Sequence, residues 1–218
     1  MKPTLFITGA ALLGILVPAA TADHRPGHGT PRNLTIGATP TTIKHGGTVT
    51  LSGKLAGQNN SGRSVTVQQD PFPVDAFTEA GTATTNSTGD WSFAHKPTAN
   101  TRYRARSGSE ESATVDVMVR PAITLRLSDR TPRAGQRVRF SGRLCPEHDG
   151  VAIALQRRFG KAWRTLRNVV LRDVAGSTCS SYSRRLRVRR DSAFRTRFLG
   201  DADHVAGNSR VRRANVHG

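Results

Sequence analysis

After residue 32 the chain repeats itself, and this internal duplication constrains its fold more than any other feature. Three blocks in the first half align with three in the second: residues 45–55 with 134–144, 62–68 with 150–156, and 103–106 with 194–197. Because the shift is about ninety residues in each block, the sequence predicts two modules of that length. We place one module at residues 33–120 and the other at 121–218.

Each module has the pattern of a series of short β-strands. Val49 and Leu51 alternate with hydroxyl side chains, and Val138 and Phe140 alternate with arginine and serine. A period of two is typical of strands with one buried and one exposed face. Turn-forming Gly and Asn clusters recur about every ten residues, and no window keeps a helical period. The sequence therefore predicts an all-β chain of two tandem immunoglobulin-like antiparallel β-sandwiches after a signal peptide.

The predicted core consists of the apolar side chains on the inner faces of these strands. In the first module they are Leu34, Ile36, Val49, Leu51, Val65, Val67, Trp91, Phe93, Tyr103 and Val117. In the second module they are Leu125, Val138, Phe140, Ile153, Leu155, Trp163, Leu186, Val188, Phe194 and Phe198. Burial of one such side chain is worth about 1.5–3 kcal/mol, so cores of this size can stabilise modest domains.

The second module also carries a longer pattern, made of residues 134–143, 153–158, Trp163, residues 194–197 and Gly200-Asp201. This pattern resembles the immunoglobulin-like repeats found in secreted and cell-surface proteins of high-GC Gram-positive bacteria. The resemblance covers nearly all of residues 33–218 and implies a spacer, adhesion or carbohydrate-adjacent role. It brings no catalytic residues to this chain. The first module departs from the pattern at residues 70–73, where the second has Phe159-Gly160.

The N-terminus has the pattern of a secretory signal peptide. Lys2 precedes a mostly apolar run over residues 5–17, Pro18 breaks that run, and residues 20–22 match an A-x-A cleavage site. The run is too short to span a bilayer well, and no later stretch is apolar enough for a membrane helix. We therefore expect residues 1–22 to be cleaved and the mature chain to be secreted, either released or held at the envelope by noncovalent contacts.

Residues 23–32 follow the cleavage site and have the composition of a disordered leader. This leader contains His24 and His28, which could bind copper or nickel loosely beside the new amino terminus. Nothing else in the sequence converges on the two histidines, so a solvated spacer is the favoured interpretation.

Both cysteines, Cys145 and Cys179, lie in the second module. An exported chain meets an oxidising environment, where two cysteines commonly pair. Cys145 ends the predicted second strand and Cys179 begins a later one, and such strands are neighbours in an immunoglobulin-type sheet. We expect a disulfide, worth about 4 kcal/mol for a loop of this length in the chain-entropy description. The alternatives are a reactive thiol or a metal pair, for which only His148 lies nearby in the sequence.

The basic charge is concentrated in the second module. Residues 23–120 contain ten Lys and Arg against eight Asp and Glu, whereas residues 121–218 contain twenty-two against seven. Twenty-one of those twenty-two are arginine, whose planar guanidinium forms paired hydrogen bonds with phosphate, sulfate or carboxylate. A surface of this charge also accelerates encounter with anions.

Seven arginines are predicted to face solvent and to form a candidate anion-binding surface: Arg137, Arg139, Arg185, Arg187, Arg189, Arg195 and Arg197. In residues 185–189 arginine alternates with Leu186 and Val188, so the arginines form an outward row if those two face the core. The pair at 137 and 139 is expected on the adjacent strand, and the pair at 195 and 197 on the opposite sheet. Arg184 and Arg190 share the parity of the core residues, and we expect them at strand ends.

Two interpretations of this charge stay open. In one, the second module contacts anionic polymers such as cell-wall polymer, acidic polysaccharide, extracellular DNA or anionic lipid. In the other, the protein is an inert extracellular spacer or adhesion stalk whose charge maintains solubility. The sequence has no recognition helix, zinc finger or interleaved surface aromatics, so sequence-specific reading of nucleic acid is not expected.

Signatures of catalysis and cofactor binding are absent from the sequence, which has no G-x-S-x-G, H-E-x-x-H or C-x-x-C motif. The best polar cluster is the run Asp201-Ala202-Asp203-His204, for which a loop between strands is favoured over a metal site. Trp163 is expected in the core rather than on the surface as a sugar platform. We therefore expect no enzyme activity, no cofactor and no metal.

Overall fold

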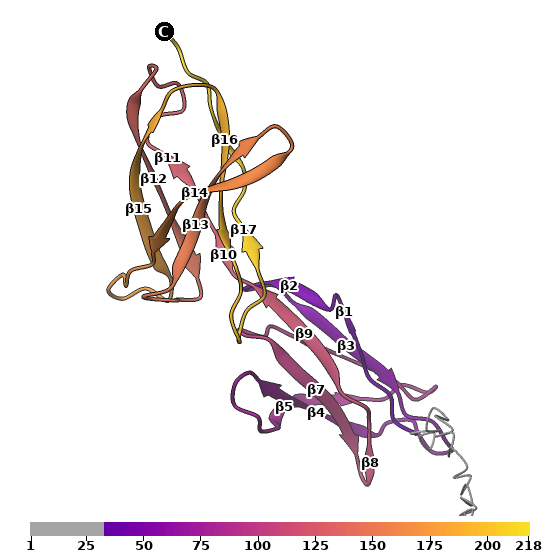
Figure 1. The fold of residues 1–218 in the computed structure, drawn as a ribbon. Coiled ribbons are helices and arrows are strands. Elements are labelled where there is room, and N and C mark those ends of the chain that lie inside the picture. The colour runs from indigo at the N-terminus through magenta and orange to yellow at the C-terminus, as the bar shows by residue number, and fades with distance from the viewer. Residues whose placement is uncertain (1–32) are drawn as a thin grey trace, which may run out of the picture. The chain divides into compact units, whose positions relative to one another are not determined.

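A computed structural model of the chain describes residues 33–218, so the predicted signal peptide and leader lie outside the described residues. Every regular element in this part of the chain is a β-strand, and the strands form four sheets (Figure 1). No helix among these residues has the length and apolar character needed to cross a membrane. Apolar clusters lie between the sheets, as in immunoglobulin-like β-sandwiches, so the predicted all-β sandwich fold is confirmed, whereas the number of tandem domains stays a prediction.

Residues 37–120 form two of the four sheets. One sheet has the strand order β1-β3-β6, and the other has the order β2-β9-β7-β4-β5 with β8 beside β7. The strands are β1 (Gly37–Thr39), β2 (Thr42–Lys44), β3 (Val49–Lys54), β4 (Ser64–Pro71), β5 (Thr78–Thr84), β6 (Asp90–His95), β7 (Thr101–Ser107), β8 (Glu110–Glu111) and β9 (Val115–Arg120). Their pairings are antiparallel except that β2 pairs with β9 in parallel, which departs from the predicted all-antiparallel arrangement.

Residues 122–214 form the other two sheets. In one, β12 pairs with β10, β11 and β15; in the other, the order is β14-β13-β16-β17 with β18 beside β16. The strands are β10 (Ala122–Ile123), β11 (Arg126–Leu127), β12 (Gln136–Cys145), β13 (Ala152–Phe159), β14 (Ala162–Val170), β15 (Ser180–Val188), β16 (Ser192–Phe198), β17 (Gly207–Asn208) and β18 (Arg212–Ala214). A parallel bridge between Arg133 and His217 is the counterpart of the β2–β9 pairing in the first half.

The duplication extends to irregularities of the backbone. Strand pair β4–β5 shifts register between Val67 and Gln68, and pair β13–β14 shifts register between Leu155 and Gln156. These two steps are equivalent in the sequence alignment of the halves. A β-bulge is a specific local feature of a sheet rather than a random defect, so its recurrence supports a common scaffold for the two halves.

Gly53 and Gly142 mark a second repeated feature, a close approach of two backbone segments. A Cβ atom on Gly53 would lie 1.9 Å from the carbonyl oxygen of Thr35, and one on Gly142 would lie 2.0 Å from that of Thr124. In both halves the same threonine hydroxyl accepts the N–H of the residue after the glycine at 2.9 Å. Only glycine leaves room for this contact, which explains why glycine recurs at this position of the repeat.

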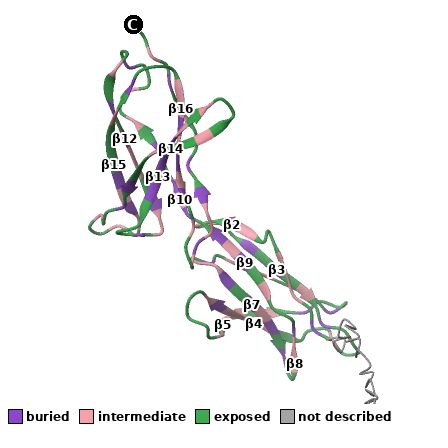
Figure 2. Ribbon diagram, in the orientation of Figure 1, coloured by how far each residue is buried: buried purple, intermediate pink, exposed green. Residues whose placement is uncertain are grey.

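Two separate apolar clusters fill the spaces between the sheets, and their strands show buried positions alternating with exposed ones (Figure 2). One cluster lies within residues 34–119 and the other within residues 123–214. Most predicted core positions are buried, and Ile36, Phe93 and Leu186 pack against a cluster while only partly buried. The module boundaries at 33–120 and 121–218 stay a prediction.

The prediction that Trp163 belongs to the core is wrong. Trp163 is half-buried and lies outside the second cluster. It pairs with Arg158 next to the tight turn between β13 and β14. Its indole stacks instead under the guanidinium of Arg195, whose central carbon is 4.5 Å from the ring centroid. Tyr182 of β15 is buried in the second cluster together with Val188, and it was not among the predicted core positions.

Candidate anion-binding surface

Four of the seven candidate arginines lie together on the outer side of the sheet that contains β12 and β15. In the antiparallel register, Arg137 lies opposite Arg187 and Arg139 lies opposite Arg185. Side chains directly opposed in this way have Cβ atoms about 4.5–5.5 Å apart. All four are exposed, whereas the alternating residues Val138, Phe140 and Val188 are buried (Figure 2). We call the four arginines the arginine face.

The arginine face has no carboxylate partner among the described residues. The Lys and Arg ion pairs of residues 33–218 all lie in the first half: Lys54–Asp90, Arg102–Asp70, Arg102–Asp116, Arg104–Glu111 and Arg106–Glu111. The one side-chain hydrogen bond that the structure gives these four arginines joins Arg187 Nη1 to the carbonyl oxygen of Gly135 at 3.2 Å. Four like charges in adjacent cross-strand pairs repel one another, so this surface favours an anion from solution.

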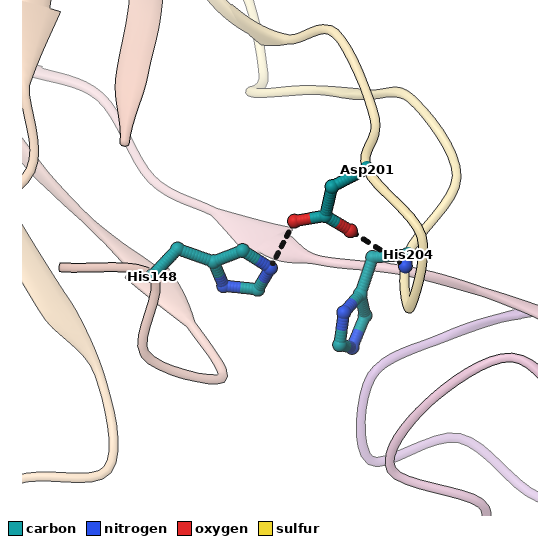
Figure 3. A group of neighbouring side chains, drawn as sticks. All are labelled: His148, Asp201 and His204. Carbon is teal, nitrogen blue, oxygen red and sulfur yellow. Dashed lines mark hydrogen bonds and ion pairs between the residues drawn. The ribbon is translucent and has the colours of Figure 1, made fainter. Parts of the chain in front are cut away.

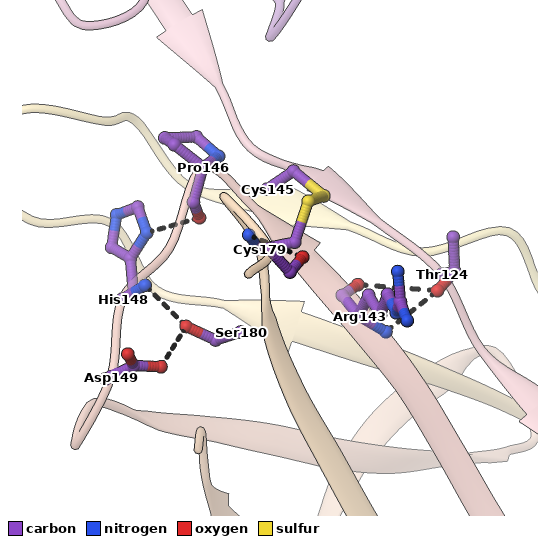
Figure 4. Close-up of a disulfide and its surroundings, with 9 residues drawn as sticks. Thr124, Arg143, Cys145, Pro146, His148, Asp149, Cys179 and Ser180 are labelled. Carbon is purple, nitrogen blue, oxygen red and sulfur yellow. Dashed lines mark hydrogen bonds between the residues drawn. A yellow bond between two sulfur atoms is a disulfide. The ribbon is translucent and has the colours of Figure 1, made fainter. Parts of the chain in front are cut away.

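An open groove of about 1090 Å³ lies along this sheet and is bounded on one side by residues 168–170 of β14, from the other sheet. Its lining includes five arginines, three serines and both cysteines: Arg126, Arg139, Arg143, Arg172, Arg184, Ser141, Ser181, Ser183, Cys145 and Cys179. Arg143 lies close to the disulfide (Figure 4). The groove therefore extends the arginine face with further guanidinium and hydroxyl donors, the groups that hydrogen-bond phosphate and sulfate oxygens.

Most residues of the groove were not predicted from the sequence. Arg143 shares the outward parity of Arg139 on β12, so extending the alternation along the strand could have found it. Arg126 lies on a two-residue strand and Arg172 on a loop, and neither has a local sequence pattern that predicts its position. Arg184 was expected at a strand end, but it lies in the middle of β15 opposite Phe140. It stays exposed because it lines the groove rather than the core.

Arg189 and Arg190 lie just beyond the end of β15, which stops at Val188. Both are exposed, so Arg189 extends the row past the sheet instead of continuing it within a strand. Arg190 lies outside the strand, as expected from its parity. These two guanidinium groups have no cross-strand partner, so the sheet does not fix their position as it fixes those of the arginine face.

Arg195 and Arg197 do not form an exposed row on the opposite sheet. Both are half-buried, and Arg195 Nε donates to Gln156 Oε1 at 2.8 Å while the guanidinium stacks on Trp163. Burial lowers the pKa of Arg195, and the neighbouring charge of Arg197 lowers it further. Arg197 Nε is buried without a hydrogen-bond partner among the described residues. The side chain of Arg195 is thus used within the fold, so we exclude this pair from the arginine face.

The first half contains a counterpart of the Arg195 arrangement. Arg104 Nε donates to Gln68 Oε1 at 2.8 Å, and the guanidinium lies 4.1 Å from the centroid of the Phe77 ring. Gln68 and Gln156 both follow the repeated bulge described above. Since the first half is not strongly basic, this recurrence marks the arginine–glutamine–aromatic contact as part of the scaffold rather than as a ligand site.

The predicted disulfide between Cys145 and Cys179 is present, with Cα atoms 4.4 Å apart (Figure 4). Cys145 ends β12 and Cys179 precedes β15, and the two strands pair along their whole length. Next to it, Ser180 Oγ accepts the backbone N–H of His148 at 2.7 Å and donates to Asp149 Oδ1 at 2.5 Å. A disulfide is compatible with a location outside the reducing cytoplasm.

No protein-family model matches the sequence, and no curated protein sequence is significantly similar to it.

Proposed function

We propose that the protein is a secreted, non-catalytic binding protein whose arginine face contacts anionic polymers such as cell-wall polymer, acidic polysaccharide or extracellular DNA. The observation that carries this proposal is the two pairs of opposed arginines, Arg137 with Arg187 and Arg139 with Arg185, which have no carboxylate partner among the described residues. An anionic chain laid across β12 and β15 relieves their mutual repulsion and accepts several charge-assisted hydrogen bonds.

Secretion is supported by the N-terminal signal-peptide pattern and by the disulfide. Polymers that carry phosphate, sulfate or carboxylate groups are available as ligands outside cells. The several guanidinium groups of the arginine face suit a polymer with repeating charges better than a single small anion. The sheet surface has no helix or aromatic platform of the kind that reads nucleic-acid bases, so binding is expected to follow charge spacing rather than sequence.

The test compares two quadruple variants of the mature chain on immobilised heparin, purified wall polymer and DNA. In the first variant, Arg137, Arg139, Arg185 and Arg187 are replaced by Gln. In the control, four exposed arginines away from β12 and β15 are replaced by Gln: Arg130, Arg164, Arg210 and Arg213. Both variants lose the same formal charge, so they differ only in where the charge is removed.

We expect wild-type retention to decrease steeply with salt, because each contacted anion releases counterions. The arginine-face variant should lose most retention, and the slope of log affinity against log salt should fall by about 3–4. The control should lose much less. Equal losses in the two variants would favour the inert spacer, in which charge only maintains solubility, and absent retention of the wild type at low salt would overturn the proposal.

A further inference from the structure

Three side chains that could ligate a metal meet beside the disulfide loop. His148 lies between β12 and β13, and Asp201 and His204 lie in the loop between β16 and β17 (Figure 3). One ligand atom from each residue lies within 4.8 Å of the other two. The loop expected at residues 201–204 is present, but the sequence analysis did not associate it with His148, which is more than fifty residues away in the chain.

The tautomer of His148 follows from its hydrogen bond. Its Nδ1 lies 2.9 Å from the carbonyl oxygen of Pro146, which can only accept, so Nδ1 carries the proton (Figure 4). In the neutral ring, Nε2 then has a lone pair and lies 3.1 Å from Asp201 Oδ2, another lone-pair donor. The His148 side chain is only 5% exposed, and in this tautomer Nε2 meets no hydrogen-bond donor among the described residues, since its contact with Asp201 is an ion pair only if the ring is protonated.

His204 is the other tautomer, with the proton on Nε2 instead of Nδ1, and it too is left with one unprotonated ring nitrogen. Its Nε2 lies 2.8 Å from the carbonyl oxygen of Thr98, so Nε2 carries the proton and the lone pair is on Nδ1. His204 is 2% exposed, and Nδ1 has no hydrogen-bond partner among the described residues.

Asp201 is positioned to supply the third ligand. Its Oδ1 accepts the backbone N–H of His204 at 2.8 Å, which leaves Oδ2 directed toward His148 (Figure 3). The Asp201 side chain is 31% exposed, so water has access to this side of the cluster. The loop is held further by the backbone N–H of Asn100, which donates to the carbonyl oxygen of Asp203 at 2.7 Å.

We propose that His148 Nε2, His204 Nδ1 and Asp201 Oδ2 form a binding site for a divalent transition-metal ion of the Zn²⁺ class, with water as the fourth ligand. Two buried imidazole lone pairs and a carboxylate oxygen that face one another without a donor are unfavourable unless a cation lies between them. Two imidazoles and one carboxylate suit Zn²⁺, whereas Ca²⁺ prefers six or more oxygen ligands.

The geometry requires only local adjustment. Tetrahedral Zn²⁺ with bonds of about 2.0–2.2 Å places its ligand atoms about 3.3 Å apart. The His148–Asp201 separation of 3.1 Å already meets this value, and the three ligand atoms lie within 4.8 Å. Each histidine donates its other ring N–H to a backbone carbonyl, which is the usual outer arrangement of metal-bound histidines. The ion would join the loop beside the disulfide to the β16–β17 loop, independently of the arginine face.

The test uses the full mature chain with His24 and His28 replaced by Ala, so that the N-terminal leader cannot contribute ligands. After chelator treatment, calorimetric titration with Zn²⁺ should show one ion bound per chain. His148→Ala, His204→Ala and Asp201→Asn should each weaken binding at least about 100-fold, since even changes outside the ligand set cost 10–100-fold. The matched control is His217→Ala, because His217 is exposed and outside the cluster; it should bind as before.

Histidine NMR of the same unmutated site gives a readout that does not depend on the folding of a variant. Zn²⁺ should shift the ring signals of His148 and His204 and leave those of His217 unchanged. The proposal is overturned if Zn²⁺ leaves the first two unshifted, if binding survives the His148 and His204 substitutions, or if His148 is found doubly protonated with Asp201 and no ion binds. In the last case a proton, not a metal, occupies the cluster.

Discussion

Strand β7 in the first half and strand β16 in the second occupy the same place in the repeat, yet their arginines have different surroundings. On β7, Arg102, Arg104 and Arg106 each lie within 4.0 Å of a carboxylate. On β16, Arg195 and Arg197 have no such partner among the described residues. The two halves share the same backbone arrangement, but only the arginines of β7 are neutralised by carboxylates. Since the first half forms its sandwich without an excess of basic residues, the excess in the second half is not needed for the fold.

The second half also carries two features that the first lacks, the disulfide and the His148–Asp201–His204 cluster. Both fasten the connection between β12 and β13, one to the start of β15 and the other to the β16–β17 loop. The first half has no cysteine and relies on its apolar cluster and its ion pairs. The added links are therefore placed in the half whose surface charges repel one another most.

The largest expected difference between the halves comes from removing the disulfide. Replacing Cys145 and Cys179 with Ser should lower the free energy of unfolding of residues 121–218 by about 4 kcal/mol, because the unfolded chain regains the freedom of the closed loop. Peptide-resolved hydrogen exchange measures the two halves separately. Protection should fall in β12–β16 and stay unchanged in β3–β9.

Reduction of the wild-type protein with a thiol serves as the control and should give the same pattern. If protection falls equally in both halves, they unfold as one cooperative unit, and the prediction of two modules is wrong.

A smaller and symmetric effect is expected at the repeated glycines. Gly53→Ala and Gly142→Ala each place a methyl group about 2 Å from a carbonyl oxygen, so backbone segments must separate. We expect each to lower the free energy of unfolding of its own half by about 1–3 kcal/mol. Denaturant titration gives the size, and hydrogen exchange locates it. Gly150→Ala is a control for backbone strain alone, because a methyl group there meets no neighbouring atom but the φ of 79° is unfavourable for alanine. A change at only one of the two glycines would contradict the common scaffold.

Sequence patterns predicted the strands and most of the core because alternation and repeat length depend on local side-chain order. The period of two located Val138, Phe140 and the outward arginines of β12 and β15. The disulfide followed from compartment and strand position. What these patterns could not supply is proximity between distant loops.

The cluster of His148 and His204 shows that limit. Each histidine lies in an irregular loop, and only the closure of the sandwich brings β13 and β16 side by side and the two loops together. The burial of Arg195 was missed for a similar reason. Parity predicted an outward side chain, but the bulge at Gln156 and the ring of Trp163 cover it.

Arg104 and Arg195 provide a test with an effect of about 1–2 kcal/mol. Arg104→Met and Arg195→Met each remove a charge-assisted hydrogen bond to glutamine and a cation–π contact, and Arg104→Met also removes the partly exposed ion pair with Glu111. Each should lower the free energy of unfolding by about 1–2 kcal/mol, less the part that the aliphatic chain retains. Heparin retention should change little in Arg195→Met and clearly more in Arg139→Met. Should Arg195→Met weaken heparin binding as strongly as Arg139→Met, the assignment of Arg195 to the scaffold fails.

The smallest expected effect is the change in stability that comes from tyrosine ionisation at high pH. Each half has one buried tyrosine, Tyr103 in the first and Tyr182 in the second, and these are the only tyrosines of the chain. Burial raises the pKa of Tyr103, and burial raises the pKa of Tyr182 to about 12, although the hydrogen bond with Thr196 lowers it somewhat. A raised pKa means that the folded state holds the proton after the unfolded chain has lost it. This contribution to stability is therefore complete below the unfolded pKa of about 10 and is lost as the pH rises toward 12.

Absorbance of tyrosinate followed against pH should show almost no ionisation near pH 10 in the folded protein, whereas denatured protein ionises there. Tyr182→Phe leaves Tyr103 as the single reporter, which should ionise at still higher pH or only on unfolding, because its hydroxyl is buried against His95 at 2.8 Å. Ordinary titration near pH 10 in the folded variant would show that the core of the first half admits water at Tyr103. The two halves would then differ in the tightness of their cores as well as in their surface charge.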